Sequence, residues 1–163
     1  MGMRVARTPV VDGDDFRRAL GRHAAGVVVV TGPGPVGLTA TSFASVSLDP
    51  PLVSFCVGRE STTWPELREA ASFAVNVLAT DQAALASRFA RKGIDRFAWP
   101  TSWHAGPGGV PILDGTAAHL VCEPYDMVAI GDHWLVVGTG LGSEGVPLLY
   151  HRGEYGRFSP HPG

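Results

Sequence analysis

A run of hydroxyl side chains marks one predicted β-strand in the first third of the chain. The segment GLTATSFASVSLDPP spans residues 37–51 and ends in two consecutive prolines. Its hydroxyl-bearing residues are Thr39, Thr41, Ser42, Ser45 and Ser47. Each buried hydroxyl needs a hydrogen-bond partner, so a strand of a hydrophobic core rarely carries this many. The segment is therefore either one wall of a binding site for a polar, planar ligand or a sheet face whose hydroxyls are hydrated.

The glycines just before this strand spell a motif that is typical of dinucleotide-binding sites. Gly32, Gly34 and Gly37 have the spacing G-x-G-x-x-G and follow a run of valines. This motif binds a pyrophosphate only when its last glycine opens a helix whose N-terminus faces the phosphates. Here the following residues are β-branched and hydroxyl-bearing, and two prolines stiffen the loop. We therefore interpret it as a tight turn between antiparallel strands and reject a Rossmann fold.

The remaining polar residues support neither metal chemistry nor hydrolysis. The six histidines show no metal-ligand spacing, and neither cysteine has a second ligand nearby. The motif G-x-S-x-G, which carries the nucleophile of many hydrolases, is absent from the sequence. We expect neither a bound metal nor a hydrolytic nucleophile.

Composition places the chain among ordinary globular proteins. Its 163 residues suit one domain, and 45% of them are apolar while 17% are charged. A net charge of −2 does not favour binding to nucleic acid or to an anionic membrane. No stretch is long and apolar enough to span a membrane, and the N-terminal residues lack the apolar core expected of a secretory signal. With Cys56 and Cys122 both inside apolar runs, we expect a cytoplasmic protein without disulfides.

Strand patterns outnumber helix patterns along the chain, and the βαβ rhythm of a doubly wound sheet is missing. Strands are predicted at 26–31, 37–48, 52–58, 73–80, 117–130, 133–142, 147–152 and 154–158. Helices are predicted at 14–26, 61–73 and 81–93. The first helix has Phe16 and Leu20 on its apolar face, and residues 94–115 are expected to be irregular. The pattern predicts a mainly β (α+β) fold, an antiparallel barrel with two or three flanking helices.

The later two helices have recognisable ends. Thr63 is expected to cap the second helix, with the Glu66 side chain reaching back toward it. Thr80 or Asp81 is expected to cap the third helix, whose basic last turn complements the helix dipole before Gly93.

Five segments, taken together, resemble the flavin reductase-like domain family. They are FRRALGRHAAGVVVVT, GLTATSFASVSLDPPLVSFCV, STTW with FAVNVLATDQ, SRFARKGIDRF and GDHWLVVG. They run in the family's order from about Phe16 to Tyr155. Similar proteins are small reductases that supply reduced flavin to two-component monooxygenases. The resemblance implies a homodimeric FMN-binding split β-barrel that holds flavin near the dimer interface.

The resemblance assigns the hydroxyl-rich strand to the flavin. It implies that the isoalloxazine ring and ribityl chain lie along Thr39, Ala40, Thr41, Ser42 and Phe43. Ser45 and Ser47 would continue this wall. The adjacent strand would line the site with Cys56, Val57 and Gly58. Short hydroxyls and exposed backbone suit the carbonyl and imide groups on one edge of the ring.

The flavin phosphate needs donors and positive charge. Ser61, Thr62 and Thr63 precede a predicted helix whose free amides offer an anion site, although Thr63 is equally well explained as a plain cap. Lys92, the only lysine of the chain, matches the position from which similar proteins reach the phosphate. Its alternative role is that of a solvated cation at a helix C-terminus.

The family resemblance also identifies a histidine as the candidate catalytic residue. His133 lies in a Gly-Asp-His segment where similar proteins place a histidine beside the nicotinamide. Its imidazole would hydrogen-bond the carboxamide or stabilise charge on the reduced flavin; otherwise it only bonds to Asp132. Tyr155 is expected to stack or hydrogen-bond near the same pocket.

These residues predict an NAD(P)H:flavin oxidoreductase in which a nicotinamide hydride passes to FMN or FAD. Residues 1–12 are expected to form a flexible lead-in and residues 13–160 the domain. The expected partners are a second copy of the chain and a separate monooxygenase, with no nucleic acid or membrane. Two alternatives are a split barrel that binds flavin without turning it over and one that uses bound flavin on a specific organic substrate.

Overall fold

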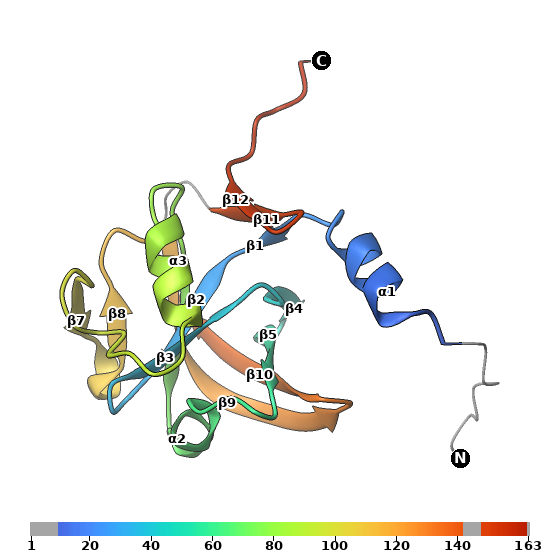
Figure 1. Cartoon of the computed structure of the whole chain (residues 1–163). Helices are drawn as coiled ribbons and strands as arrows, with labels where there is room; N and C mark the ends of the chain where they lie inside the picture. The colour runs from blue at the N-terminus through green and yellow to red at the C-terminus, as the bar shows by residue number, and fades with distance from the viewer. Residues whose placement is uncertain (1–9, 142–147, 163) are drawn as a thin grey trace, which may run out of the picture.

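The fold is built on a seven-stranded antiparallel sheet that curls into an open barrel (Figure 1). The computed structural model describes residues 10–141 and 148–162. In the order of their pairing, the strands are β3 (Val36–Ala40), β2 (Val28–Gly32), β6 (Phe73–Val77), β9 (Ala118–Ile130), β10 (His133–Leu141), β5 (Pro51–Gly58) and β4 (Ala44–Leu48). The edge strands β3 and β4 do not pair with each other, so the sheet stays open. The predicted mainly β class and antiparallel split barrel are confirmed.

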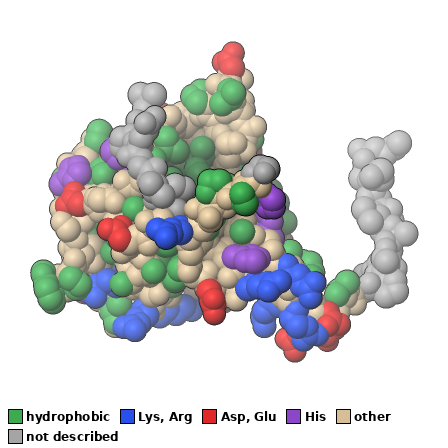
Figure 2. Space-filling view, turned by 90° about the horizontal axis from the view of Figure 1, so that it is seen from above, with side chains coloured by type: hydrophobic (Ala, Val, Ile, Leu, Met, Phe, Trp, Pro, Cys, Tyr) green, Lys and Arg blue, Asp and Glu red, His purple; other side chains and the backbone are tan. Residues whose placement is uncertain are grey.

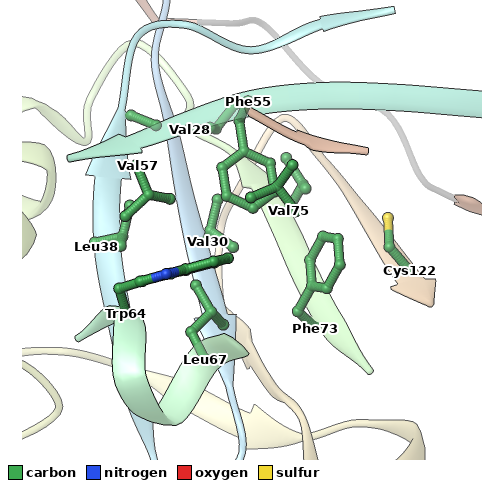
Figure 3. Packing of buried hydrophobic residues seen from close by; sticks show 12 residues of the cluster. Val28, Val30, Leu38, Phe55, Val57, Trp64, Leu67, Phe73, Val75 and Cys122 are labelled. Carbon is green, nitrogen blue, oxygen red and sulfur yellow. The ribbon is translucent and has the colours of Figure 1, made fainter. Parts of the chain in front are cut away.

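Strand β2 lies between two hydrophobic clusters, which explains its run of valines. Val28 and Val30 point into the barrel, where Phe55 and Phe73 meet edge to face with ring centroids 5.5 Å apart (Figure 3). Val29 lies in a second cluster that also contains residues of α3. In the sequence, a strand that is covered on both faces is a continuous run of apolar residues. Each fully buried side chain of this size contributes about 1.5–3 kcal/mol.

The predicted turn at the glycine-rich motif is present. β2 and β3 are antiparallel neighbours, and Gly32 at the end of one pairs with Val36 at the start of the other. No helix follows Gly37. The rejection of a Rossmann fold is therefore confirmed.

The first helix differs from its prediction. Helix α1 (Gly13–Leu20) is shorter than expected and contains no buried residue, with Phe16 56% and Leu20 55% exposed. It projects away from the barrel in Figure 1. Asp12 caps it by accepting a 2.9 Å hydrogen bond from the Asp14 amide. The apolar periodicity correctly predicted a helix. The apolar face with Phe16 and Leu20 is not covered by other residues of the described chain.

The caps predicted for the other helices are wrong. Helix α2 (Trp64–Glu69) has no side-chain cap, because the Thr63 hydroxyl accepts a hydrogen bond from Arg96 instead. Helix α3 (Ala83–Ala90) begins after Gln82, whose side chain accepts a hydrogen bond from the Ala79 amide. Arg96 thus engages the Thr63 hydroxyl, and neither Thr80 nor Asp81 caps α3.

The segment predicted to be irregular contains a small hairpin. Strands β7 (Trp103–Ala105) and β8 (Pro111–Leu113) pair around a 3₁₀ turn, η1 (Pro107–Gly109). Buried Asn76 fixes it to the barrel by accepting a 2.9 Å hydrogen bond from the Leu113 amide. Its amide nitrogen donates to the Val29 carbonyl and to Thr31, each at 3.0 Å. Such fully paired buried groups specify position as well as stability.

A third, three-stranded sheet joins the two ends of the described chain. It consists of β1 (Ala25–Gly26), β11 (Leu149–His151) and β12 (Glu154–Gly156), in that order. The predicted hairpin around Gly153 is present, and Gly153 has the positive φ of 79° that favours glycine. Residues 1–9 of the predicted lead-in lie outside the described residues, as do positions 142 and 147 of the predicted strands. Within the described ranges no helix is long and apolar enough to cross a membrane.

Candidate functional site

The hydroxyl-rich segment is two strands, which corrects the prediction of one continuous strand over 37–48. Residues 41–43 separate the two strands. Strand β3 forms one edge of the open sheet and strand β4 forms the other edge. The Ser42 hydroxyl accepts a 2.8 Å hydrogen bond from the Cys56 amide of β5. Ser42 therefore ties the break to β5 at a point where strand pairing provides no link.

A cleft of ≈450 Å³ lies over this break, between β3, β5 and the C-terminal end of α3. It is lined by many of the residues that the sequence assigned to a flavin site. These are Thr39, Ala40, Thr41, Ser42, Cys56, Val57, Gly58, Ser61, Thr62, Lys92 and His133. Residues that are far apart in the sequence thus meet on one concave surface, and the opening of the barrel is what creates it.

Five predicted residues do not line the cleft. Phe43 packs against the barrel core, and Ser45 and Ser47 lie on edge strand β4, beyond the break. Thr63 is buried and accepts a hydrogen bond from Arg96. Tyr155 belongs to the three-stranded sheet, where it packs against a neighbouring tyrosine.

Close packing of α3 against β3 builds one wall of the cleft. The Thr39 hydroxyl donates a 2.7 Å hydrogen bond to the Ala86 carbonyl of α3. A Cβ atom on Gly37 would lie 2.8 Å from the Phe89 ring, so only glycine permits this approach. The last glycine of the apparent dinucleotide motif is thus needed for helix–strand packing. The hydroxyl hydrogen of Thr39 is used within the protein and leaves only acceptor lone pairs for a ligand.

Arg96 lines the cleft and was not singled out by the sequence. Its Nη1 donates to the Gly37 carbonyl at 2.6 Å and to the Thr63 hydroxyl at 2.9 Å, and its Nε donates to the Arg91 carbonyl at 2.8 Å. Partial burial lowers the pKa of Arg96, but a guanidinium remains charged at neutral pH. Within the described residues no carboxylate pairs with it, so its positive charge is available to an anion.

The sequence did not indicate Arg96 as a site residue, because its position depends on contacts with segments that are distant in the sequence. It lies in the segment that the sequence marked as irregular, four residues beyond Lys92. Both side chains line the cleft. The expected anion site at the N-terminus of α2 is less favourable, since that helix has only six residues. Ser61 there accepts a 3.3 Å hydrogen bond from the Thr63 amide.

His133 and Glu60 also line the cleft. His133 pairs with Gly58 across β10 and β5, and a Cβ atom on Gly58 would lie 3.9 Å from its Nε2. The Nδ1 atom lies 2.7 Å from the Asp132 carboxylate, and this hydrogen bond lowers the pKa of Asp132. An ionised carboxylate keeps the proton on Nδ1, so Nε2 of the neutral ring is an acceptor.

Aromatic packing fixes the strand beneath this histidine. Trp134, the next residue of β10, packs against Trp64 of α2 with ring centroids 6.0 Å apart. The Arg68 guanidinium lies 5.1 Å and the Arg59 guanidinium 5.8 Å from the Trp134 ring. Cation–π contacts of this kind contribute about 0.5–1 kcal/mol at exposed sites. The start of β10 is therefore held between α2 and the turn after β5.

The tryptophan-containing loop, residues 99–109, does not cover the cleft. Its residues Pro100, Thr101 and Ser102 instead border a second cleft of ≈560 Å³ on another side of α3. That cleft also contains Asp114, whose carboxylate bonds to Ser102 and to His104 and has a lowered pKa for that reason. Access to the first cleft is therefore not blocked by this loop.

A group of arginines on and beside α1 lies outside both clefts. Figure 2 shows basic side chains gathered on this side of the molecule, with acidic ones next to them. A hollow between α1 and the final hairpin is lined by Arg17, Arg18, Arg22 and Arg152. Two of them face aspartates one helical turn away, so part of the charge is neutralised within α1.

Comparisons with known proteins agree with this geometry. A family model described as flavin reductase like domain matches residues 20–159. The chain is 43% identical to an NADH:FMN oxidoreductase of Rhodococcus erythropolis, with 96% of this chain and 89% of the relative covered. It is 38% identical to the reductase subunit HsaB of a flavin-dependent monooxygenase of Rhodococcus jostii, with 92% and 80% covered.

A solved structure adds a direct link between the fold and its ligands. The NADH:FAD oxidoreductase SgcE6 of Streptomyces globisporus, in complex with NAD and FAD fragments, superposes with a TM-score of 0.85. The identity is 36%, and the match covers 94% of this chain and 98% of that chain.

Proposed function

This chain belongs to the flavin reductase-like domain family, and from that membership we propose that it is an NAD(P)H-dependent flavin reductase that supplies reduced flavin to a separate monooxygenase. One observation on the structure carries the proposal. A single cleft combines a wall of small side chains with two cations, Lys92 and Arg96, and a histidine, His133. Flavin mononucleotide has the complementary form, a planar ring with a phosphate on a flexible chain.

The cleft suits a flavin in size and in charge. Its ≈450 Å³ lies within the range of about 300–1,000 Å³ that is typical of small-molecule sites. Lys92 and Arg96 would hold the phosphate. The ring would lie along the small residues of β3 and β5, with Cys56 and Gly58 on the β5 side. Either FMN or FAD satisfies these requirements.

The chemistry of the reaction belongs to the two cofactors, since a bound flavin accepts a hydride from a reduced nicotinamide. The protein binds and orients them. Strands β3 and β5 provide rigid walls, and Ser42 keeps the two walls together. His133 offers Nε2 beside Gly58, and Asp132 fixes the orientation of its ring. We assign to His133 the role of positioning the nicotinamide through this nitrogen.

Steady-state turnover tests the proposed function. Purified protein is expected to accelerate NADH oxidation only when free FMN or FAD is added, because the flavin is the electron acceptor. The measurement is the loss of NADH absorbance with and without each flavin. Absence of turnover with both flavins and both nicotinamides would refute the reductase. A flavin that binds tightly without turnover would instead favour a binding protein.

We also propose that the protein is a homodimer. Exposed apolar side chains lie on edge strand β4 and on the second half of β9, where the β9–β10 hairpin extends beyond the barrel (Figure 1). They are Val46, Leu48, Tyr125, Val128 and Ile130. Helix α1 likewise has no buried residue. Apolar groups concentrated in this way favour association, because burial removes them from water.

Substitutions in β9 are expected to weaken the dimer. Val128 and Ile130 lie two residues apart and so project from the same face of the strand. Replacing both with glutamate introduces charges that would need to be desolvated in an interface. Light scattering after size exclusion should give twice the chain mass for the wild type and the chain mass for Val128→Glu/Ile130→Glu. Trp99→Glu, at a residue that is 90% exposed beside the other cleft, is the control and should stay dimeric. A dimeric double variant would show that β9 is not the interface.

We further propose that the reductase works in the cytoplasm. Both cysteines are free thiols, as in proteins of reducing compartments. Burial raises the pKa of Cys122 to about 12, so this thiol stays protonated and unreactive.

A further inference from the structure

Helix α1 presents an apolar face that no described residue of its own chain covers. Phe16 is 56% and Leu20 55% exposed, and the two lie one helical turn apart on the same side of the helix. A helix of eight residues is marginal in water by itself, and helices of this length in proteins are stabilised by packing of their apolar face. The face of α1 therefore requires a surface to pack against.

The hollow beside α1 carries positive charge that the described chain leaves unpaired. Arg22 and Arg152 both line it. The Arg152 amide donates a 2.6 Å hydrogen bond to the Gly21 carbonyl, and His151 Nε2 donates to the Arg22 carbonyl at 2.9 Å. These backbone contacts bring the two arginines to one hollow. The other two arginines there pair with aspartates of α1, whereas neither Arg22 nor Arg152 has an ion pair within the described ranges.

The second half of β9 offers a surface of the opposite charge. Met127 packs against the barrel core, so Asp126, Val128 and Ile130 project from the other, outward face of the strand. All three are exposed, and so is Glu123. Among the described residues neither carboxylate forms an ion pair. This face combines apolar and acidic side chains, as α1 and its hollow combine apolar and basic ones.

The two surfaces are placed so that a second copy of the chain can join them. In Figure 1, α1 and the β9–β10 hairpin both project from the same side of the barrel. A two-fold axis on that side brings α1 of each protomer to β9 of the other, so the same contact forms twice. Burial of the apolar side chains stabilises such a contact, and the opposite charges favour this pairing over others.

Building on the proposed homodimer, we propose that helix α1 of one protomer packs on the outward face of β9 of its partner. The hollow with Arg22 and Arg152 then faces Glu123 and Asp126 of the other chain. The uncovered apolar face of α1 and the exposed apolar residues of β9 are two sides of one interface.

Two variants of opposite charge test this contact. Arg22→Glu/Arg152→Glu makes both surfaces acidic, and Glu123→Arg/Asp126→Arg makes both basic. Each variant alone is expected to raise the dissociation constant of the dimer about 10-fold or more, because like charges meet at both contacts. Mixed in equal amounts, the two variants should form a heterodimer, because each contact then joins opposite charges. Sedimentation velocity at about 0.15 M salt measures both effects.

A third variant tests the apolar part of the contact. Phe16→Ala/Leu20→Ala should weaken the dimer on the order of 10-fold through lost apolar burial. Since α1 buries no residue in its own chain, the barrel should stay folded, which near-ultraviolet circular dichroism checks. Arg91→Glu is the control for the charge variants, because Arg91 is an exposed arginine that lines the other cleft beside α3. It should remain as dimeric as the wild type.

The outcomes separate the contact from the dimer itself. Charge variants that each dimerise like the wild type, or a mixture of them that stays monomeric, would overturn the packing of α1 on β9. A monomeric wild type would instead refute the homodimer.

Discussion

Replacing Arg96 with alanine is expected to raise the dissociation constant of FMN about 10- to 100-fold. Charge-assisted hydrogen bonds to phosphate are among the stronger polar contacts, and Arg96 is fixed in advance by Gly37, Thr63 and Arg91. Quenching of flavin fluorescence measures the affinity. Arg96→Lys keeps the charge but loses the fixed geometry, so its affinity should be intermediate.

Two comparisons separate the charge of Arg96 from its structural role. Riboflavin lacks the phosphate, so its affinity should hardly change in Arg96→Ala. Arg88 holds the same loop through the carbonyls of Asp95, Arg96 and Ala98, but it does not line the flavin cleft. Arg88→Ala should therefore leave FMN binding close to the wild type. Equal losses for riboflavin and FMN would indicate a disordered loop and would contradict phosphate binding by Arg96.

The barrel was predictable because its strands carry local signals. The valine run of β2 and the apolar run of β5 are covered on both faces or packed against the core. Strand propensity and hydrophobicity together predict strands of this kind. Gly153 predicted the final hairpin, because glycine readily adopts the positive φ that it has in this turn. Pairing order follows from none of these signals, since it depends on contacts between segments that are distant in sequence.

The hydroxyl-rich segment shows where sequence reasoning fails. The Thr39 hydroxyl donates to the Ala86 carbonyl, which is 47 residues away, and the Ser42 hydroxyl accepts from the Cys56 amide. These partners satisfy hydroxyls that the sequence could only assign to a ligand or to water. The break at Ser42 was equally hidden, because Ser42 and Cys56 are brought together only when the sheet curls. The segment is thus both part of the framework and a wall of the cleft.

The missed elements share one physical cause. Arg96 and the β7–β8 hairpin both lie in the segment 94–115, whose glycines, prolines and short strands give no periodic pattern. Their positions are set by tertiary hydrogen bonds that Arg96 donates to Thr63 and that the Leu113 amide donates to Asn76. Local propensity carries no information about such contacts.

A tryptophan placed in the flavin cleft is expected to abolish function without unfolding the protein. Thr41 is exposed and lines the cleft at the break between β3 and β4. In Thr41→Trp the indole would occupy the space of the flavin ring, and flavin affinity should fall on the order of 100-fold. Ser87→Trp is the matched control, because Ser87 is an exposed residue of α3 that lines the second cleft instead.

The rate of anaerobic FMN reduction by NADH tests this account most directly, because loss of flavin absorbance records hydride transfer itself. The wild type and Ser87→Trp are expected to bleach the flavin at equal rates, whereas Thr41→Trp should show only the uncatalysed rate. Full activity in Thr41→Trp, or loss of activity in Ser87→Trp alone, would contradict the assignment of flavin chemistry to the cleft between β3, β5 and α3.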